Sequence, residues 1–157
     1  MNINRVLGSV VLAITASTAS ADEPTSIAQV KTLVIHDVAA TAESAICLAD
    51  LEERLAVGGF TLVSADAADA EMTVAVAVMG GKRGFGGALF GSLEYDVNYL
   101  IKVLSLPSHR ELLSFKGHQE NSLESACKWM AKRTLSKIEE ARKESVAPES
   151  KASDKPK

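Results

Sequence analysis

Aromatic residues are scarce in this sequence, since phenylalanine, tyrosine and tryptophan together make up 4% of its 157 residues. Lysine and arginine are not gathered into a basic block, and the formal net charge is −3 at pH 7. Proteins that bind nucleic acid usually carry a basic patch, and those that bind single strands add aromatic side chains on which bases stack. The composition therefore predicts no nucleic-acid partner.

The motifs of common catalytic sites are also missing. No serine stands in a G-x-S-x-G sequence, no C-x-x-C pair is present, and the three histidines lack the short spacing of metal ligands. A glycine-rich stretch fails the Walker pattern because Arg83 follows Gly81-Lys82, and it fails the dinucleotide pattern because Leu89 replaces the third glycine. We therefore expect no catalytic residue, cofactor or metal, and we expect that the protein is not an enzyme.

The amino terminus has the features of a secretory signal. Arg5 gives a positive start, residues 6–16 form a short apolar run, and residues 19–21 read Ala-Ser-Ala. We expect cleavage after Ala21 and a periplasmic or secreted protein, with a retained membrane anchor as the alternative. No cysteine stands at the cleavage site, so a lipid anchor is not expected.

The rest of the chain is long enough for one domain with its own core. Residues 145–157 contain proline, serine and lysine but almost no large apolar side chain, which is typical of disorder. The sequence therefore predicts a cleaved signal at 1–21, a single domain at 22–144 and a disordered tail at 145–157.

Hydrophobic patterns predict five strands and two helices within this domain. Alternating or continuous β-branched runs indicate strands, and apolar stripes at helical spacing indicate helices. The expected elements are strand 30–38, helix 41–59, strands 60–64, 71–79, 94–106 and 111–117, and helix 121–143. This order, β-α-β-β-β-β-α, predicts an α+β fold with a single mixed or antiparallel sheet and two helices packed on one face.

Strand 71–79 has unequal faces. One face carries methionine and valines, and the other carries small side chains such as Ala75 and Ala77. Because small side chains let a helix lie close, the helices are predicted on the alanine face. In strand 94–106, Asp96 and Asn98 indicate a face that meets solvent near the start of the strand.

Each predicted helix begins with a capping residue and carries one of the two cysteines. Thr41 is the expected cap of the first helix, and Asn121, with Glu124 three residues on, is the expected cap of the second. Cys47 and Cys127 each lie six residues after the cap, on an apolar stripe. If the helices are parallel, their sulfur atoms lie at similar height, and an oxidising compartment then favours a disulfide. Two unpaired core thiols are the alternative.

Residues 79–92 carry six of the ten glycines and join two predicted strands. A flexible loop with apolar and cationic side chains suits contact with a partner protein or an anionic membrane surface. In the alternative, its phenylalanines fold back onto the end of the sheet. The expected partner-binding residues are Lys82, Arg83, Phe85, Leu89 and Phe90.

The element order, a helix ending in Gly-Gly-Phe, and the phrase "ADAADAEMTVAVAVMGG" resemble a group of envelope proteins, as do "YDVNYLIKVLSLPSHRELLSFKG" and "NSLESACKWMAKRTLSKI". The group comprises the periplasmic domains of the curli-secretion channel family, the amino-terminal domain of TolB and the lipoprotein activators of penicillin-binding proteins. The resemblance spans about residues 30–138. It implies a domain that binds and assembles envelope components without catalysis.

These observations predict a non-enzymatic, exported binding or assembly module of the bacterial cell envelope. Its expected partner is an envelope protein or an anionic membrane surface, and a homo-oligomer is a further option. The alternatives are a small soluble ligand carrier and a hydrolase. A carrier needs a sizeable apolar cavity, against which the alanine face argues, and a hydrolase needs a polar pocket with a strongly perturbed titrating group.

Overall fold

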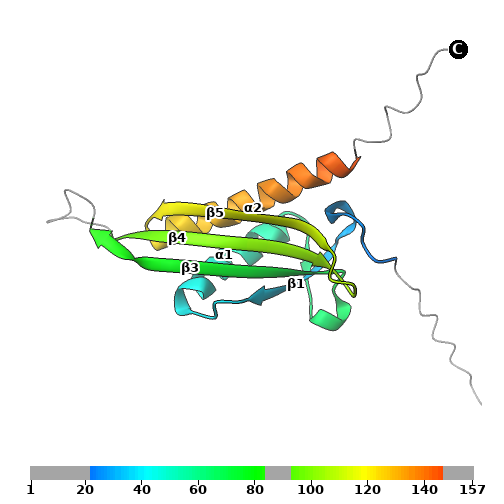
Figure 1. Cartoon of the computed structure of the whole chain (residues 1–157), viewed down its shortest axis with the longest axis horizontal. Helices are drawn as coiled ribbons and strands as arrows, with labels where there is room; N and C mark the ends of the chain where they lie inside the picture. Colours follow the sequence, from blue (N-terminus) through cyan, green and yellow to red (C-terminus); the bar gives the residue numbers. More distant parts are fainter. Residues whose placement is uncertain (1–21, 84–92, 147–157) are drawn as a thin grey trace, which may run out of the picture.

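The computed structural model describes residues 22–83 and 93–146 (Figure 1). The elements are η1 Ile27–Gln29, β1 Thr32–Asp37, α1 Ala42–Val57, β2 Thr61–Leu62, η2 Ala65–Ala67, β3 Ala70–Arg83, β4 Leu93–Ser105, β5 Glu111–Asn121 and α2 Leu123–Val146. The predicted α+β fold and its element order are confirmed. The predicted signal at 1–21 and residues 147–157 of the predicted tail lie outside the described residues. Within the described ranges, no helix has the length and apolar character needed to cross a membrane.

The sheet is mixed and has the strand order β2-β1-β3-β4-β5. Strand β1 is parallel to both of its neighbours, β2 and β3, whereas β3, β4 and β5 are antiparallel to one another. One edge of the sheet is therefore the two-residue strand β2, and the other is the eleven-residue strand β5.

Both helices lie on one face of the sheet, and Figure 1 shows the strands in front of them. The helices cover the face of β3 that carries Met72 and Val74, which are fully buried. The predicted placement on the alanine face is wrong, because Ala77 is exposed and Ala75 is only partly buried. Covering the larger aliphatic side chains removes more apolar area from water, which outweighs the closer approach that alanine allows.

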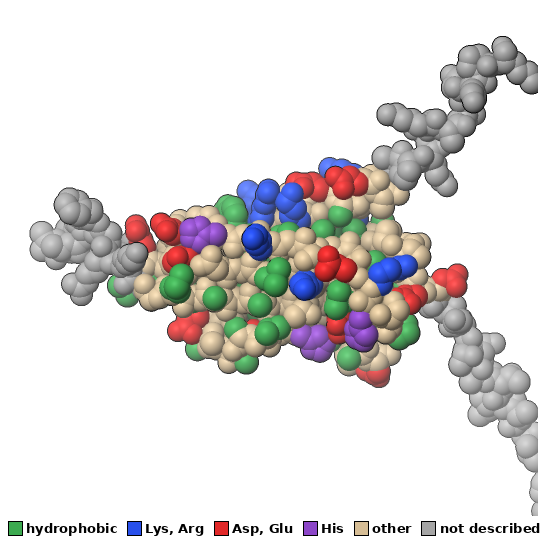
Figure 2. All heavy atoms as spheres, in the orientation of Figure 1, with side chains coloured by type: hydrophobic (Ala, Val, Ile, Leu, Met, Phe, Trp, Pro, Cys, Tyr) green, Lys and Arg blue, Asp and Glu red, His purple; other side chains and the backbone are tan. Residues whose placement is uncertain are grey.

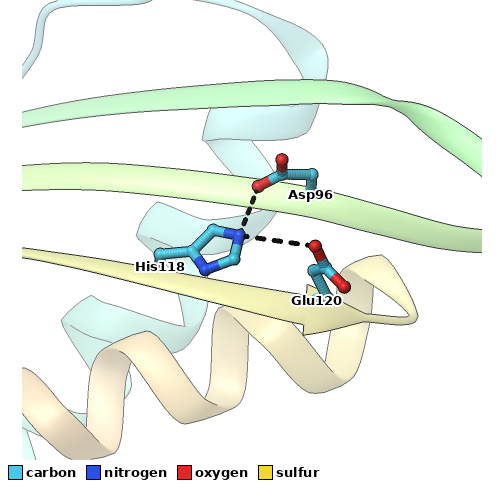
Figure 3. Close-up of side chains that lie close together, drawn as sticks. All are labelled: Asp96, His118 and Glu120. Carbon is cyan, nitrogen blue, oxygen red and sulfur yellow. Dashed lines mark ion pairs between the residues drawn. The ribbon is translucent and has the colours of Figure 1, made fainter.

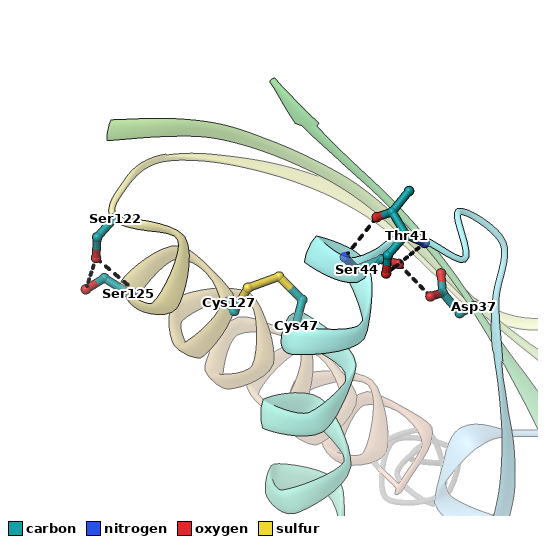
Figure 4. Close-up of a disulfide and its surroundings, with 7 residues drawn as sticks. All are labelled: Asp37, Thr41, Ser44, Cys47, Ser122, Ser125 and Cys127. Atoms are coloured by element: carbon teal, nitrogen blue, oxygen red, sulfur yellow. Dashed lines mark hydrogen bonds between the residues drawn. A yellow bond between two sulfur atoms is a disulfide. The ribbon is translucent and has the colours of Figure 1, made fainter. Parts of the chain in front are cut away.

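The capping of α1 is confirmed and ties the helix to β1 (Figure 4). The Ser44 N–H donates to Thr41 Oγ1 at 3.1 Å, and the Thr41 N–H donates to Ser44 Oγ at 2.9 Å. The buried Ser44 hydroxyl donates in turn to Asp37 Oδ2 at 2.6 Å. This side-chain hydrogen bond lowers the pKa of Asp37. The end of β1 and the first turn of α1 therefore form one polar joint.

The cap of α2 is Ser122 rather than the predicted Asn121. The Ser125 N–H donates to Ser122 Oγ at 3.4 Å, and Asn121 is the last residue of β5. Strand β5 continues past its predicted end at Gly117 because its later residues pair with the start of β4, up to Tyr95 opposite Asn121. The chain is therefore still extended where the helix was expected to begin.

Strand β3 also exceeds its predicted length. It continues to Arg83, with an irregular register between Met79 and Lys82. Lys82 and Arg83 thus belong to a strand, and the connection to β4 comprises residues 84–92 instead of the predicted 79–92.

A disulfide joins Cys47 of α1 to Cys127 of α2, with the Cα atoms 4.5 Å apart (Figure 4). Further along both helices, Arg142 of α2 donates to the carbonyl oxygen of Gly58 at 3.4 Å and lies 4.2 Å from the centroid of the Phe60 ring. Early residues of α1 therefore meet early residues of α2, and late residues meet late ones. The two helices run parallel.

Candidate functional site

The face of the sheet away from the helices, here called the open face, is the candidate site. Figure 2 shows it toward the viewer, with hydrophobic, basic and acidic side chains interspersed and histidines near its two ends. Strand register places the following residues on it: Glu71, Thr73, Ala75 and Ala77 of β3, Asp96, Asn98, Leu100 and Lys102 of β4, and Lys116, His118 and Glu120 of β5. The prediction that Asp96 and Asn98 face away from the core is confirmed.

The centre of the open face is a mainly apolar hollow of about 420 Å³. Ala75 and Ala77 form part of its lining, and their small side chains leave the depression. Leu100 and Val38 border it and are 39% and 61% exposed. The alanine face of β3, which was expected to exclude a cavity by tight packing, instead holds this hollow because no helix covers it.

Gly117 lines the hollow on β5 and pairs with Tyr99 across the sheet. The Tyr99 ring is buried on the helix side, where it makes edge contacts with Phe115 and Trp129 at centroid distances of 6.4 and 6.3 Å. A Cβ atom at position 117 would overlap this ring. The Tyr99 hydroxyl has no hydrogen-bond partner among the described residues, and burial raises its pKa. This pair therefore serves packing.

At one end of the open face, His118 lies between two carboxylates (Figure 3). Its Nε2 atom is 2.7 Å from Asp96 Oδ1 and 3.9 Å from Glu120 Oε1. The Asn98 side-chain amide donates to Asp96 Oδ1 at 2.8 Å. Sequence reasoning placed His118 and Glu120 near each other but missed Asp96, which reaches them only through the pairing of β4 with β5.

At the other end, two histidines share Glu71 of β3. His36 Nε2 lies 3.7 Å from Glu71 Oε2, and His109 Nδ1 lies 3.0 Å from Glu71 Oε1. Each imidazole thus contacts a different oxygen of the same carboxylate. The alternation of β1 and β3 puts His36 and Glu71 on one face, but only the fold brings in His109 from the turn between β4 and β5.

The predicted partner-binding residues lie where β3 and β4 end. Lys82 and Arg83 are in the last part of β3, whereas Phe85, Leu89 and Phe90 lie outside the described residues. The register shift in β3 sets Met79 opposite Asp96. The expected contact loop therefore begins beside the end of the open face that carries His118.

No family model and no curated protein sequence matches this chain. Several solved structures share its fold. The PelC dodecamer from Paraburkholderia phytofirmans is 15% identical over 74% of this chain and 93% of that chain, with a TM-score of 0.52. A protein of family DUF330 from Xanthomonas campestris is 10% identical over 74% and 88%, with a TM-score of 0.50. A minor lipoprotein from Acinetobacter baumannii is 9% identical over 71% and 94%, with a TM-score of 0.47. At these identities the likeness is one of fold alone.

Proposed function

We propose that this chain is an exported, non-enzymatic binding or assembly module of the bacterial cell envelope that holds a partner protein on its open face. The observation that carries the proposal is the apolar hollow at the centre of an uncovered sheet. An uncovered sheet face usually carries polar side chains at its centre. Here the centre carries Ala75, Ala77 and Leu100, and charged residues surround them. An apolar centre with a polar rim is the usual anatomy of a protein interface.

The export part of the proposal is supported by the signal-like residues 1–21, which predict a mature protein beginning at Asp22 in the periplasm or outside the cell. The resemblance to the curli-secretion channel, TolB and penicillin-binding-protein activator group supports assembly without catalysis. PelC, which shares the fold, is described as a dodecamer. A second copy of this chain is therefore one candidate for the partner.

A protein partner is favoured over an anionic membrane surface by the charge of the open face. Asp96 and Glu120 at one end and Glu71 at the other would repel acidic lipid headgroups, and the whole chain has a net charge of −3. The predicted loop residues Lys82 and Arg83 would then add attraction to an acidic protein that extends beyond the hollow.

A soluble ligand carrier is the second candidate, because about 420 Å³ falls within the range of small-molecule pockets. Such pockets usually bury most of the ligand surface, whereas this hollow is open to solvent on a sheet. An inserted side chain from a partner protein, which brings its own cover, fits the hollow better.

Replacing Leu100 by glutamate is expected to abolish partner binding while changing the free energy of unfolding by less than about 1 kcal/mol, because the side chain is already partly exposed. The matched control is Val57→Glu, which alters an exposed apolar residue at the end of α1. A photo-crosslinker at position 100 or 57 in living cells measures the contact, and mass spectrometry identifies the attached protein. Crosslinking at 57 but not at 100, or full binding by Leu100→Glu, would exclude the open face.

Replacing Phe85, Leu89 and Phe90 together by serine should weaken the same association and leave the thermal midpoint nearly unchanged. Each large apolar side chain buried on binding contributes roughly 1.5–3 kcal/mol. Added salt should weaken the part of the binding that depends on Lys82 and Arg83. A variant that unfolds readily would show instead that these residues belong to the core.

A further inference from the structure

The cluster of Asp96, His118 and Glu120 has the composition and geometry of a metal site. Among the described residues, it is the one group of three such side chains whose potential ligand atoms all lie within 4.8 Å of one another. Figure 3 shows the His118 ring directed at both carboxylates. We propose that these three residues bind a divalent transition-metal cation, Zn²⁺ by preference.

The fold brings the ligands together through strand pairing. Asp96 of β4 lies directly opposite Glu120 of β5, and His118 lies two residues before Glu120 on the same face. Like charges directly opposite each other destabilise a sheet pair. A cation held between the two carboxylates converts this repulsion into attraction.

The spacing of the donor atoms suits a small ion. Ligand atoms about 2.0 Å from a tetrahedral Zn²⁺ are about 3.3 Å from one another. The present distances of 2.7 and 3.9 Å from His118 Nε2 bracket this value. The three side chains are 33–71% exposed, so they can adjust by the remaining fraction of an ångström without disturbing the core.

The donor set selects among ions. One imidazole nitrogen with two carboxylate oxygens is typical of Zn²⁺ and similar transition metals, whereas Mg²⁺ and Ca²⁺ prefer oxygen ligands throughout. The Asn98 amide that donates to Asp96 Oδ1 at 2.8 Å holds the carboxylate in place. Such an outer hydrogen bond orients a metal ligand and raises affinity.

A second, smaller hollow of about 160 Å³ adjoins the cluster. Met79, Gly80 and Glu94 line it together with Asp96 and Glu120. Glu94 brings a third carboxylate to the site, and the open space leaves room for water or a partner's donor atom. Three protein ligands and an open position form a common zinc arrangement.

The test uses the untagged protein and ZnCl₂ in isothermal titration calorimetry. We expect one Zn²⁺ per chain that excess Mg²⁺ does not displace. His118→Gln and Asp96→Asn should each weaken binding by at least tenfold, and Asn98→Ala should weaken it less. His109→Gln is the matched control, because it removes an equally exposed histidine that also contacts a glutamate. It should leave the affinity unchanged.

A second readout locates the ion directly. Zn²⁺ should protect His118, but not His36 or His109, from modification by diethyl pyrocarbonate, as measured by mass spectrometry. Circular dichroism confirms that each variant is folded, and Glu120→Gln serves if His118→Gln is not. Undiminished Zn²⁺ binding by folded ligand variants, equal loss with His109→Gln, or no binding would each overturn the site. Leu100→Glu should still bind Zn²⁺, so this result is independent of the proposed partner surface.

Discussion

Replacing both Cys47 and Cys127 by alanine is expected to lower the free energy of unfolding by about 4 kcal/mol. The bridged residues are 80 positions apart, so the disulfide closes a long loop in the unfolded chain and reduces its conformational entropy. Both side chains are fully buried, so alanine keeps the sites apolar. Small domains are typically stable by only 5–15 kcal/mol, which makes this loss a large fraction of the total.

Urea unfolding of the double variant and of the native protein with and without reductant measures this effect. The reduced native protein should resemble the variant, and both should expose more surface on unfolding than the bridged chain, which a larger dependence on urea would show. Denatured but unreduced native protein should give no signal with a thiol label. Two labelled thiols per chain, or equal stability of the double variant, would contradict the bridge.

Gly117→Ala is expected to lower the free energy of unfolding by about 2–3 kcal/mol, because the added methyl group overlaps the Tyr99 ring. Edge contacts with Phe115 and Trp129 hold this ring, so it cannot swing away freely. Gly80→Ala is the matched control, since Gly80 also lies in a strand and no atom lies within 4 Å of an added Cβ there. It should be neutral or slightly stabilising.

A double-mutant cycle attributes the loss to the ring itself. Tyr99→Ala is destabilising alone because it leaves a cavity. In that background, Gly117→Ala should have little further effect, so the two changes should not be additive. If Gly117→Ala were as harmless as Gly80→Ala in the native background, the neighbours of Tyr99 would not fix its position.

The sequence predicts well those features that depend on near neighbours along the chain. Cys47, Leu51 and Leu55 repeat at helical spacing, and all three are buried where α1 meets the rest of the core. Thr41 was identified as a cap because its hydrogen bonds reach only three residues ahead. Element order followed from such local signals.

Features that depend on distant partners could not be predicted in the same way. The alternation of β3 defines two faces but does not say which one the helices cover, and the alanine face was wrongly chosen. The meeting of Asp96 with Glu120 depends on the register between two strands, which single-strand patterns do not contain. Sequence reasoning therefore found the hairpin but not the cluster that it carries.

Asp69 shows how a recognisable phrase can have a structural role. It lies in the Asp-Ala phrase before β3, and its Oδ2 accepts from the backbone N–H groups of Thr32 at 2.9 Å and Lys31 at 3.1 Å. Burial acts to raise the pKa of Asp69, but these N–H donors outweigh it and lower the pKa. The carboxylate fixes the start of β1, so the phrase reflects architecture and gives no information on a ligand.

The unequal edges of the sheet limit how copies of this protein can assemble. Strand β2 offers two residues to an incoming strand, whereas β5 offers eleven. Growth by strand addition in one direction needs a long edge on both sides, so it cannot propagate here. Pairing of β5 with β5 of a second copy is two-fold symmetric and uses up the long edge of each, which closes the assembly at two. A larger ring must be built from another surface, so the number of copies in solution shows whether an edge or a face joins them.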